Sequence, residues 1–346
     1  MEATYIKMAK QALFESYVHN DSLPLCLRSG NCKSCINASD NNPPLYEMVQ
    51  SRVNSGDIFF SVEISPPKTV TGTVHSLSNL HEMKHGGALY CSVTWHPGND
   101  PGGTSLTSSM TIAGFAAKHS GCETMLHMAG SHISHQQMDE YLHDDSECEK
   151  SDFPYAVDFV QHIEQKFGKQ FTIAVAGYPC GHPEAQSYLQ DLQYLKSKVE
   201  AGANLILTQM FFEAETFIKF VHDCRSLGIS VPIIPGIMPI QSYASLMHMV
   251  RLTRVQLPTN FSRDLEQIKH HDEAVESYGI HKSVELCQKI FEAGVAPGIH
   301  IFTLNRSSAP IELCKRLGMW LHGPMLPLAC CIKDVNDQDK GLSYKN

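Results

Sequence analysis

Glu63 is the residue with the clearest capacity for acid–base chemistry, because it interrupts the apolar run Ile58–Ile64 just before Ser65-Pro66-Pro67. A carboxylate in apolar surroundings is costly to bury in its ionised form, so its pKa is expected to rise. A carboxyl group with a raised pKa can act as a general acid near neutral pH. The alternative is a structural Glu held in an ion pair, and position alone favours neither interpretation.

Other polar and aromatic residues stand at the ends of three further apolar runs. Thr94 and Trp95 end one run, His127 lies near the end of the next, and Tyr178 ends a third. His182-Pro183-Glu184-Ala185 follows Tyr178 closely. Tyr and His can stack on a planar ligand and hydrogen-bond to it. A single His in a strand is more often a satisfied core residue, so His127 alone indicates little.

Three later features carry polar groups that could contact a ligand. Asp191 and Lys198 are seven residues apart on a predicted helix and therefore lie on the same face. From the spacing alone, we predict that this face is exposed to solvent. Gln209 precedes Met210-Phe211-Phe212, and its amide could recognise a heterocycle. Arg306 could pair with a carboxylate or stack on a ring. A packed rim and a surface ion pair are the alternatives for Gln209 and Arg306.

Several common sites have no signature in this sequence. It contains no Walker-type loop, no G-x-G-x-x-G after a strand, no G-x-S-x-G and no H-E-x-x-H. No Lys lies within a predicted strand, which disfavours an aldolase-like barrel with a Schiff base. Cys32-Lys33-Ser34-Cys35 lacks a second pair of zinc ligands at a sensible spacing. We therefore expect no metal site, and reduced cysteines in a cytoplasmic protein.

Short apolar runs alternate with longer amphipathic stretches from Ile58 onward, which predicts repeated βα units around a parallel sheet. The predicted strands are Ile58–Ile64, Leu89–Trp95, Thr124–Met128, Thr172–Tyr178, Leu205–Met210, Pro232–Ile237 and Gly298–Leu304. The predicted helices are Ser105–His119, Pro154–Phe167, Pro183–Ala201, Ala214–Leu227, Ser242–Thr253 and Ala274–Ala293. These amount to about seven of the eight units of an α/β (β/α)8 barrel. One unit is missing or degraded between Met128 and Thr172, where no apolar strand occurs.

Composition limits the classes of partner. The chain has 346 residues, 36 acidic against 27 basic, and a formal net charge of −9. This balance argues against nucleic-acid and membrane partners, which both favour clustered Lys and Arg. No apolar run reaches the roughly 18 residues of a membrane-spanning helix, and the N-terminus has no secretory apolar segment. Residues 1–45 are polar and irregular, which predicts a mobile extension before a single barrel over residues 46–320.

Taken together, the segments resemble methylenetetrahydrofolate reductase, in the order that this family has them. The matching pieces are Phe60–Lys68, Val93–Pro97, Leu126–Met128, Ala176–Pro179, His182–Ala185, Thr208–Phe212, Pro235–Ile237 and Phe302–Arg306. They span about residues 57 to 320, and the ordered set is highly specific. Trp95-His96-Pro97 and Leu317-Gly318-Met319-Trp320 look like the eukaryotic branch.

The resemblance implies FAD-dependent reduction of 5,10-methylenetetrahydrofolate to 5-methyltetrahydrofolate with NAD(P)H, by ping-pong transfer through the flavin. Glu63 resembles the catalytic general acid that protonates the folate nitrogen N10. Positions implied to hold FAD are Thr94, Trp95, His127, Tyr155, Ala156, Tyr178, His182, Pro183, Glu184, Ala185, Asp191 and Lys198. Positions implied to contact the folate are Gln209, Phe302 and Arg306. Phe302 replaces a usual Tyr, so the resemblance implies only stacking there.

The sequence departs from the family pattern in three places. The strand that ends in Ala-Leu-Arg-Gly-Asp is absent between His127 and Tyr155, and its Arg and Asp would bind the flavin. The motif His-Leu/Met-Thr-Cys reads His127-Met128-Ala129-Gly130. The C-terminal regulatory domain is not present, and residues 321–346 would be a linker remnant or divergent tail. An inactive or truncated relative that binds a full-length reductase is therefore the alternative, and homo-oligomers are compatible with either interpretation.

Overall fold

Eight strands form a closed barrel in the part of the chain that the structure describes. This computed structural model describes residues 3–6, 43–95, 102–103, 105–129, 153 and 155–321. The order around the barrel is β1-β4-β3-β2-β8-β7-β6-β5. The strands are β1 (Ala3–Ile6), β2 (Phe59–Ile64), β3 (Tyr90–Val93), β4 (Glu123–Ala129), β5 (Ile173–Gly177), β6 (Leu205–Met210), β7 (Ile233–Ile237) and β8 (Gly298–Phe302).

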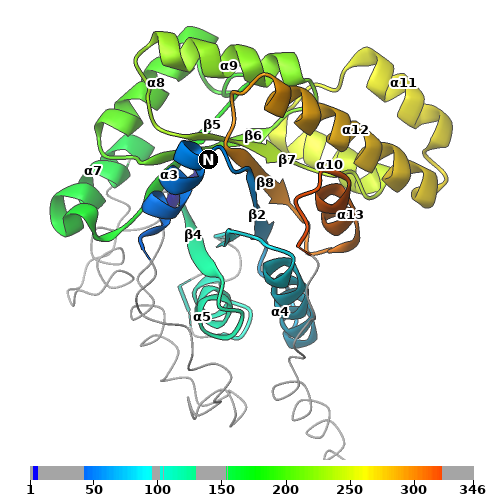
Figure 1. Cartoon of the computed structure of the whole chain (residues 1–346), viewed down its shortest axis with the longest axis horizontal. Coiled ribbons are helices and arrows are strands. Elements are labelled where there is room, and N and C mark those ends of the chain that lie inside the picture. Colours follow the sequence, from blue (N-terminus) through cyan, green and yellow to red (C-terminus); the bar gives the residue numbers. More distant parts are fainter. Residues whose placement is uncertain are drawn as a thin grey trace, which may run out of the picture.

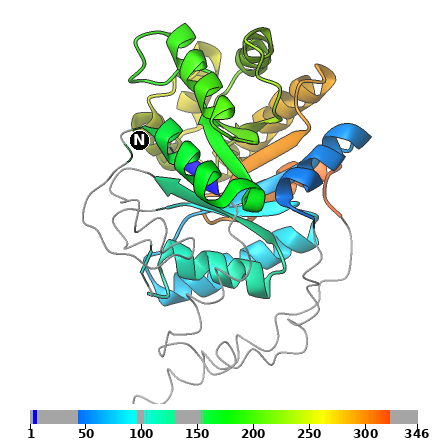
Figure 2. The same cartoon turned by 90° about the vertical axis from the view of Figure 1, so that its left-hand side faces the viewer.

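The described helices lie around the outside of the barrel and across one of its ends (Figure 1). They are α3 (Leu45–Ser55), α4 (Val70–His85), α5 (Ser109–His119), α7 (Ala156–Phe167), α8 (Tyr188–Glu200), α9 (Ala214–Ser226), α10 (Tyr243–Thr253), α11 (Thr259–Ile268), α12 (Asp272–Glu292) and α13 (Ser308–Arg316), with a 3-10 turn at Gly168–Gln170. The side view shows α4 and α5 next to each other beneath the strands (Figure 2). No described helix is long and apolar enough to cross a membrane.

The strands are buried on both faces, which is why their sequences are apolar throughout rather than alternating. Every residue of β3, β5 and β7 is buried. The outward faces pack against the helices, while inward side chains such as Phe59, Tyr90 and Leu205 form a separate inner cluster. Leu45 and Val49 of α3 belong to that inner cluster and are fully buried. Helix α3 therefore covers the end of the barrel at which the strands begin.

Seven strands are parallel, as the sequence predicts, and the expected barrel lacking one βα unit is confirmed. The place of the missing unit, between β4 and β5, is occupied by β1. This strand runs antiparallel to both neighbours, with Tyr5 opposite His127 on β4 and Ala174 on β5. Pairing with β1 satisfies backbone groups that would otherwise lie at two open strand edges.

Strand β1 lies inside the segment 1–45 that the sequence predicts to be a mobile extension. Residues 3–6 are part of the barrel instead, because the open edges of β4 and β5 offer them hydrogen-bond partners on both sides. The sequence could not show this pairing, which joins positions more than a hundred residues apart. The proposed domain boundaries at residues 45 and 320 stay predictions.

Candidate functional site

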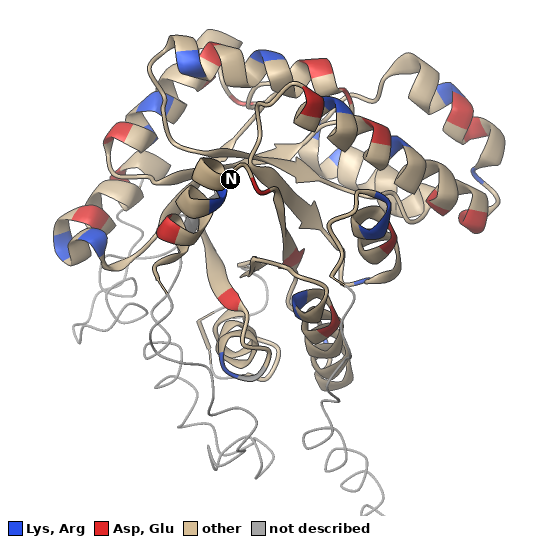
Figure 3. Ribbon diagram, viewed as in Figure 1, with Lys and Arg blue, Asp and Glu red and all other residues tan. Residues whose placement is uncertain are grey.

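Glu63 is one of two acidic residues in the described strands, and the other is Glu123 at the start of β4. Lys and Arg occur in none of these strands, so charge is concentrated on the helices (Figure 3). The Glu63 side chain lies near the carboxyl end of β2 and is 14% exposed. This end of a (β/α)8 barrel is where such folds carry their active sites. Glu63 is thus the isolated charge at the expected mouth.

Three side chains, from β4, from β8 and from the residue after β3, surround the Glu63 carboxylate. The Thr94 hydroxyl, just after β3, donates a hydrogen bond of 2.9 Å to Oε1. The Nε2 atoms of His127 on β4 and of His300 on β8 each lie 3.4 Å from Oε2. The two imidazoles are 6% and 0% exposed. One carboxylate therefore meets two buried imidazoles and one hydroxyl, which is an arrangement that can store and deliver a proton.

The pKa of Glu63 is lowered, opposite to the expectation of a raised pKa. Burial acts to raise it, but His127, His300 and the Thr94 hydroxyl favour the carboxylate and outweigh the burial. Burial also lowers the pKa of His127 to about 4, so this imidazole is neutral near pH 7. The sequence showed the apolar surroundings of Glu63 but not the polar partners that the other strands bring to it.

His300 is a site residue that sequence analysis missed. It lies on β8 opposite Ser61, whose Oγ is 2.8 Å from the His300 Nδ1. The Ser92 hydroxyl of β3 is 3.2 Å from Nε2. The available signal was a lone His in the apolar strand Gly298–Phe302, two residues before Phe302 and hence on the same face.

The ends of β2 and β8 are tied together beside Glu63. The Thr303 hydroxyl donates to the backbone carbonyl of Glu63 at 2.6 Å, and the Asn305 side chain exchanges two hydrogen bonds with the backbone of Ser65. Leu304 and Asn305 have φ values of 48° and 61°, in the left-handed region that non-glycine residues rarely adopt. The strained turn fixes the backbone on which the carboxylate stands, and it presents Arg306 as an exposed side chain.

A second group of predicted residues lies around the end of β5. The rings of Tyr178 and His182 pack edge to face at 4.6 Å. Asp191 accepts a hydrogen bond from the His182 backbone N–H, and the Lys198 ammonium donates to the carbonyl of Ala176. Asp191 and Lys198 are 4% and 3% exposed, so the prediction that they lie on a solvent-exposed helix face is wrong. They face inward because each pairs with backbone near the strand end.

The remaining predicted residues are less closely grouped. Trp95 is 8% exposed and follows Thr94, whereas Tyr155 is 72% exposed at the start of α7 beside the buried Ala156. Pro183 and Glu184 are exposed in the loop after β5, with Ala185 partly buried.

The predicted folate contacts approach the site from β6 and β8. Phe302 packs its ring edge to face against His300 at 5.5 Å. Gln209 accepts a hydrogen bond from the Met210 backbone through its own Oε1. A further residue that the sequence did not indicate is Gln241, which is 4% exposed and donates to the carbonyl of Thr303 at 2.9 Å. The Gln241 Oε1 has no hydrogen-bond partner among the described residues.

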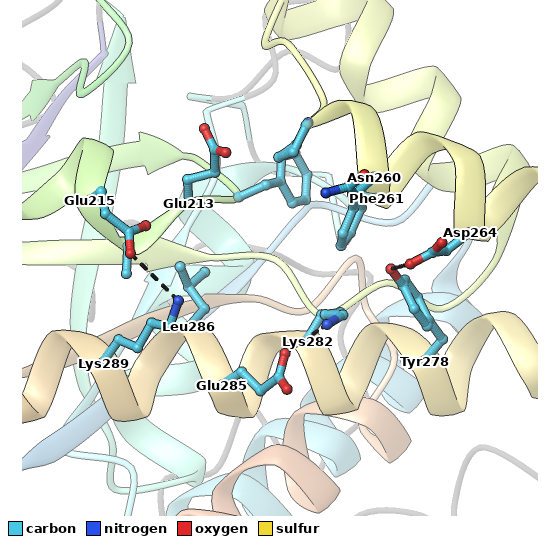
Figure 4. Close-up of a pocket in the computed structure, with 13 residues that line it drawn as sticks. Glu213, Glu215, Asn260, Phe261, Asp264, Tyr278, Lys282, Glu285, Leu286 and Lys289 are labelled. Atoms are coloured by element: carbon cyan, nitrogen blue, oxygen red, sulfur yellow. Dashed lines mark hydrogen bonds and ion pairs between the residues drawn. The ribbon is translucent and has the colours of Figure 1, made fainter.

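A cavity of about 300 Å³ lies between α9, α11 and α12, and none of the predicted site residues lines it. Figure 4 shows its charged rim, where Lys289 pairs with Glu215 at 3.5 Å and the Tyr278 hydroxyl donates to Asp264 at 3.0 Å. These polar groups satisfy one another. This cavity therefore lies apart from the Glu63 cluster.

Comparisons with known proteins show which sequences this chain is similar to. A sequence model described as methylenetetrahydrofolate reductase matches residues 48–148 and 139–318. A relative named probable methylenetetrahydrofolate reductase (NADPH) from Caenorhabditis elegans is 39% identical over 297 residues, which is 80% of this chain and 44% of the relative. Methylenetetrahydrofolate reductase (NADH) 1 from Arabidopsis thaliana is 34% identical over 303 residues, 79% of this chain and 50% of the relative. The chain spans about half the length of these relatives.

A solved structure shares the fold at low sequence similarity. It is an uncharacterised protein from Clostridium thermocellum, with a TM-score of 0.58 and 13% identity, and the match covers 78% of this chain and 98% of that chain.

Proposed function

The chain belongs to the methylenetetrahydrofolate reductase family, and from this premise we propose that it reduces 5,10-methylenetetrahydrofolate to 5-methyltetrahydrofolate with NAD(P)H. The observation that carries the proposal is the Glu63 carboxylate, which stands at the barrel mouth in contact with Thr94, His127 and His300. The family resemblance implies that Glu63 is the general acid, and the three contacts hold its carboxyl group in a fixed position.

FAD is the cofactor that the family implies, and when bound it would pass a hydride from NAD(P)H to the folate. The donor set at the ends of β3 and β5 fits such a group. Thr94 and Trp95 follow β3, and the Tyr178 and His182 rings lie beside the end of β5. Asp191 and Lys198 hydrogen-bond to the backbone of His182 and Ala176 near the end of β5. A large planar ligand can stack on these rings, and the buried polar groups hold the surrounding loops in place.

Glu63 would protonate the folate N10, which opens the five-membered ring. In the described structure the lowered pKa of Glu63 favours the carboxylate, so the acid form has to be favoured by ligand binding. A ring placed over the exposed part of Glu63 would exclude water and disfavour the charge, which raises the pKa of a carboxyl group. During this step, Thr94 contacts the Glu63 Oε1 and His300 contacts the Glu63 Oε2, so the carboxyl group keeps its position. Positioned proton transfer of this kind contributes about 10²–10⁴-fold to a rate.

Gln209, Phe302 and Arg306 would select the folate. Gln209 can offer both a donor and an acceptor to a pteridine edge, and Phe302 presents an apolar ring beside the acid. The exposed Arg306 can pair with a carboxylate. The structural neighbour from C. thermocellum is described as binding two copies of 5-methyl-5,6,7,8-tetrahydrofolic acid, which is compatible with a folate ligand in this fold.

A flavin absorbance spectrum of the purified chain, followed by NAD(P)H oxidation with an artificial electron acceptor, tests the proposal. We expect a yellow protein that transfers electrons to the acceptor and forms 5-methyltetrahydrofolate. A colourless protein that takes up no added FAD would rule out the catalytic function.

A second function is favoured by one observation: the sequence has no Arg-Gly-Asp between β4 and α7. A catalytically inactive chain could bind a full-length reductase as a partner subunit. Co-purification with such a reductase, without bound flavin, would support this alternative. The cytoplasmic location stays a prediction in either case.

A further inference from the structure

Three potential metal ligands meet at one point inside the barrel. The Oε2 of Glu63 and the Nε2 atoms of His127 and His300 all lie within 4.8 Å of one another. They come from β2, β4 and β8, so their meeting depends on the pairing of strands that are distant in the sequence rather than on any local sequence motif. This explains why a search for metal-ligand spacing in the sequence found nothing at these positions.

Two of the three separations between these atoms match those of neighbouring ligands around a zinc ion. The Glu63 Oε2 is 3.4 Å from the Nε2 of each imidazole. With Zn–N and Zn–O bonds of about 2.0–2.1 Å and tetrahedral angles, neighbouring ligand atoms lie about 3.3–3.4 Å apart. The carboxylate can therefore share a zinc ion with either ring at its present distance. The Nε2 atoms of the two imidazoles lie within 4.8 Å of each other, so both bind the same ion once the rings approach to the spacing of zinc ligands.

Surrounding hydrogen bonds orient two of the ligands. The Ser61 hydroxyl donates to the carbonyl of Ile299, so its oxygen can accept from the His300 Nδ1–H at 2.8 Å. In this tautomer the His300 Nε2 carries the lone pair, and a cation that binds there takes the place of the Ser92 hydroxyl, which lies 3.2 Å from the same nitrogen. The Thr94 hydroxyl occupies Oε1 and leaves Oε2 for a cation. A hydrogen bond to the second nitrogen of a ligating His is the usual support of a protein metal site.

We propose that Glu63, His127 and His300 form a two-His, one-carboxylate site that binds Zn²⁺. The two imidazoles are buried and Glu63 is 14% exposed, so a water molecule can complete the coordination from the barrel mouth. Nitrogen donors disfavour Mg²⁺ and Ca²⁺. If the proposed reductase function holds, bound Zn²⁺ blocks the folate step, because it occupies the Glu63 oxygen that would carry the proton.

Other groups in the chain could bind zinc, and the test must separate them. His81 and His85 lie on α4 with their Nε2 atoms 3.1 Å apart, and Cys180 is an exposed thiol. Co²⁺ is the probe that distinguishes them, since low-symmetry cobalt sites absorb visible light and thiolate ligands add intense near-ultraviolet charge-transfer bands. The proposed site has only nitrogen and oxygen ligands, so visible bands are expected without the thiolate bands.

The experiment titrates the purified full chain with Co²⁺ and then with Zn²⁺. We expect one equivalent of cobalt to give the visible bands and zinc to remove them. Glu63→Gln should abolish the bands, and Ser61→Ala should weaken Co²⁺ binding about 10–100-fold, the range for loss of such a supporting residue. His85→Gln is the matched control and should leave the bands unchanged. Circular dichroism of each variant establishes that it is folded.

Bands that survive in folded Glu63→Gln, bands lost in His85→Gln, or thiolate charge-transfer bands in place of the visible ones would overturn the proposal. The result is independent of activity, because the cobalt spectrum needs neither flavin nor folate. If the chain binds Co²⁺ at Glu63 but takes up no flavin, the proposed metal site is supported and the proposed reductase function is contradicted. In an active chain, Zn²⁺ should suppress folate reduction more than electron transfer to an artificial acceptor, and a chelator should restore it.

Discussion

His300 and Glu63 are 237 positions apart in the sequence, yet the Nε2 of His300 lies 3.4 Å from the Glu63 Oε2 on the neighbouring strand. The contact joins the first and last strands of the parallel part of the barrel, β2 and β8. His300 is completely buried, and hydroxyls of Ser61 and Ser92 meet its two ring nitrogens. A carboxylate that is otherwise isolated among apolar strands thereby acquires a fixed polar environment.

Replacing the acid with its amide should separate the two half-reactions. Glu63→Gln keeps the shape of the side chain but removes the proton donor, so we expect folate reduction to fall by about 10²–10⁴-fold. Flavin reduction by NAD(P)H needs no acid at N10 and should remain within a few-fold of the parent. Stopped-flow absorbance measures each half-reaction separately. An equal loss in both would mean that Glu63 serves flavin binding rather than proton transfer.

Removing the Thr94 hydroxyl should raise the pKa of Glu63. Thr94→Val keeps the side-chain shape and removes the hydrogen bond to Oε1, one of the contacts that favour the carboxylate. A general acid is active in its protonated form, so the basic limb of the pH profile of folate reduction should move to higher pH. Ser109→Ala removes a nearby hydroxyl that donates to the Thr94 carbonyl instead, and its profile should not move. An unshifted Thr94→Val profile would contradict the assignment of the acid.

The buried His127 should make stability fall in mild acid. Its folded-state pKa of about 4 lies below the value near 6.5 of an unfolded His, so the unfolded chain binds more protons between these pH values. The stability associated with neutral His127 is present above pH 6.5 and is lost as pH falls towards 4, by about 3 kcal/mol in total. Urea unfolding at a series of pH values measures this loss.

His127→Gln should flatten the dependence of unfolding free energy on pH in this window. His248→Gln, at an exposed position on α10, should leave it unchanged. A parent protein with the same unfolding free energy at pH 6.5 and pH 4.5 would show that His127 is not buried in its neutral form.

Proline at position 5 should open the barrel. The Tyr5 backbone lies between His127 on β4 and Ala174 on β5, and proline removes an N–H donor from this central position. We expect Tyr5→Pro to destabilise the fold by about 3 kcal/mol and to increase aggregation through the freed edges. Glu2→Pro, before the first residue of β1, is the matched control. Thermal unfolding and light scattering compare the two, and identical behaviour would mean that β1 is not needed for closure.

Local patterns in the sequence were enough to predict the parallel strands, the site of the missing βα unit and the position of Glu63 at a strand end. These features depend on apolar runs such as Ile173–Gly177 and on residues next to them in the chain, which the sequence displays directly. Only the tertiary structure decided which strand closes the gap, whether Asp191 and Lys198 face inward, and which groups surround Glu63. His300, Thr94 and His127 meet the carboxylate because strands that are distant in the sequence pair in the barrel. The direction of its pKa shift follows from those partners, because a short-range electrostatic effect depends on distances in space that the order of residues does not contain.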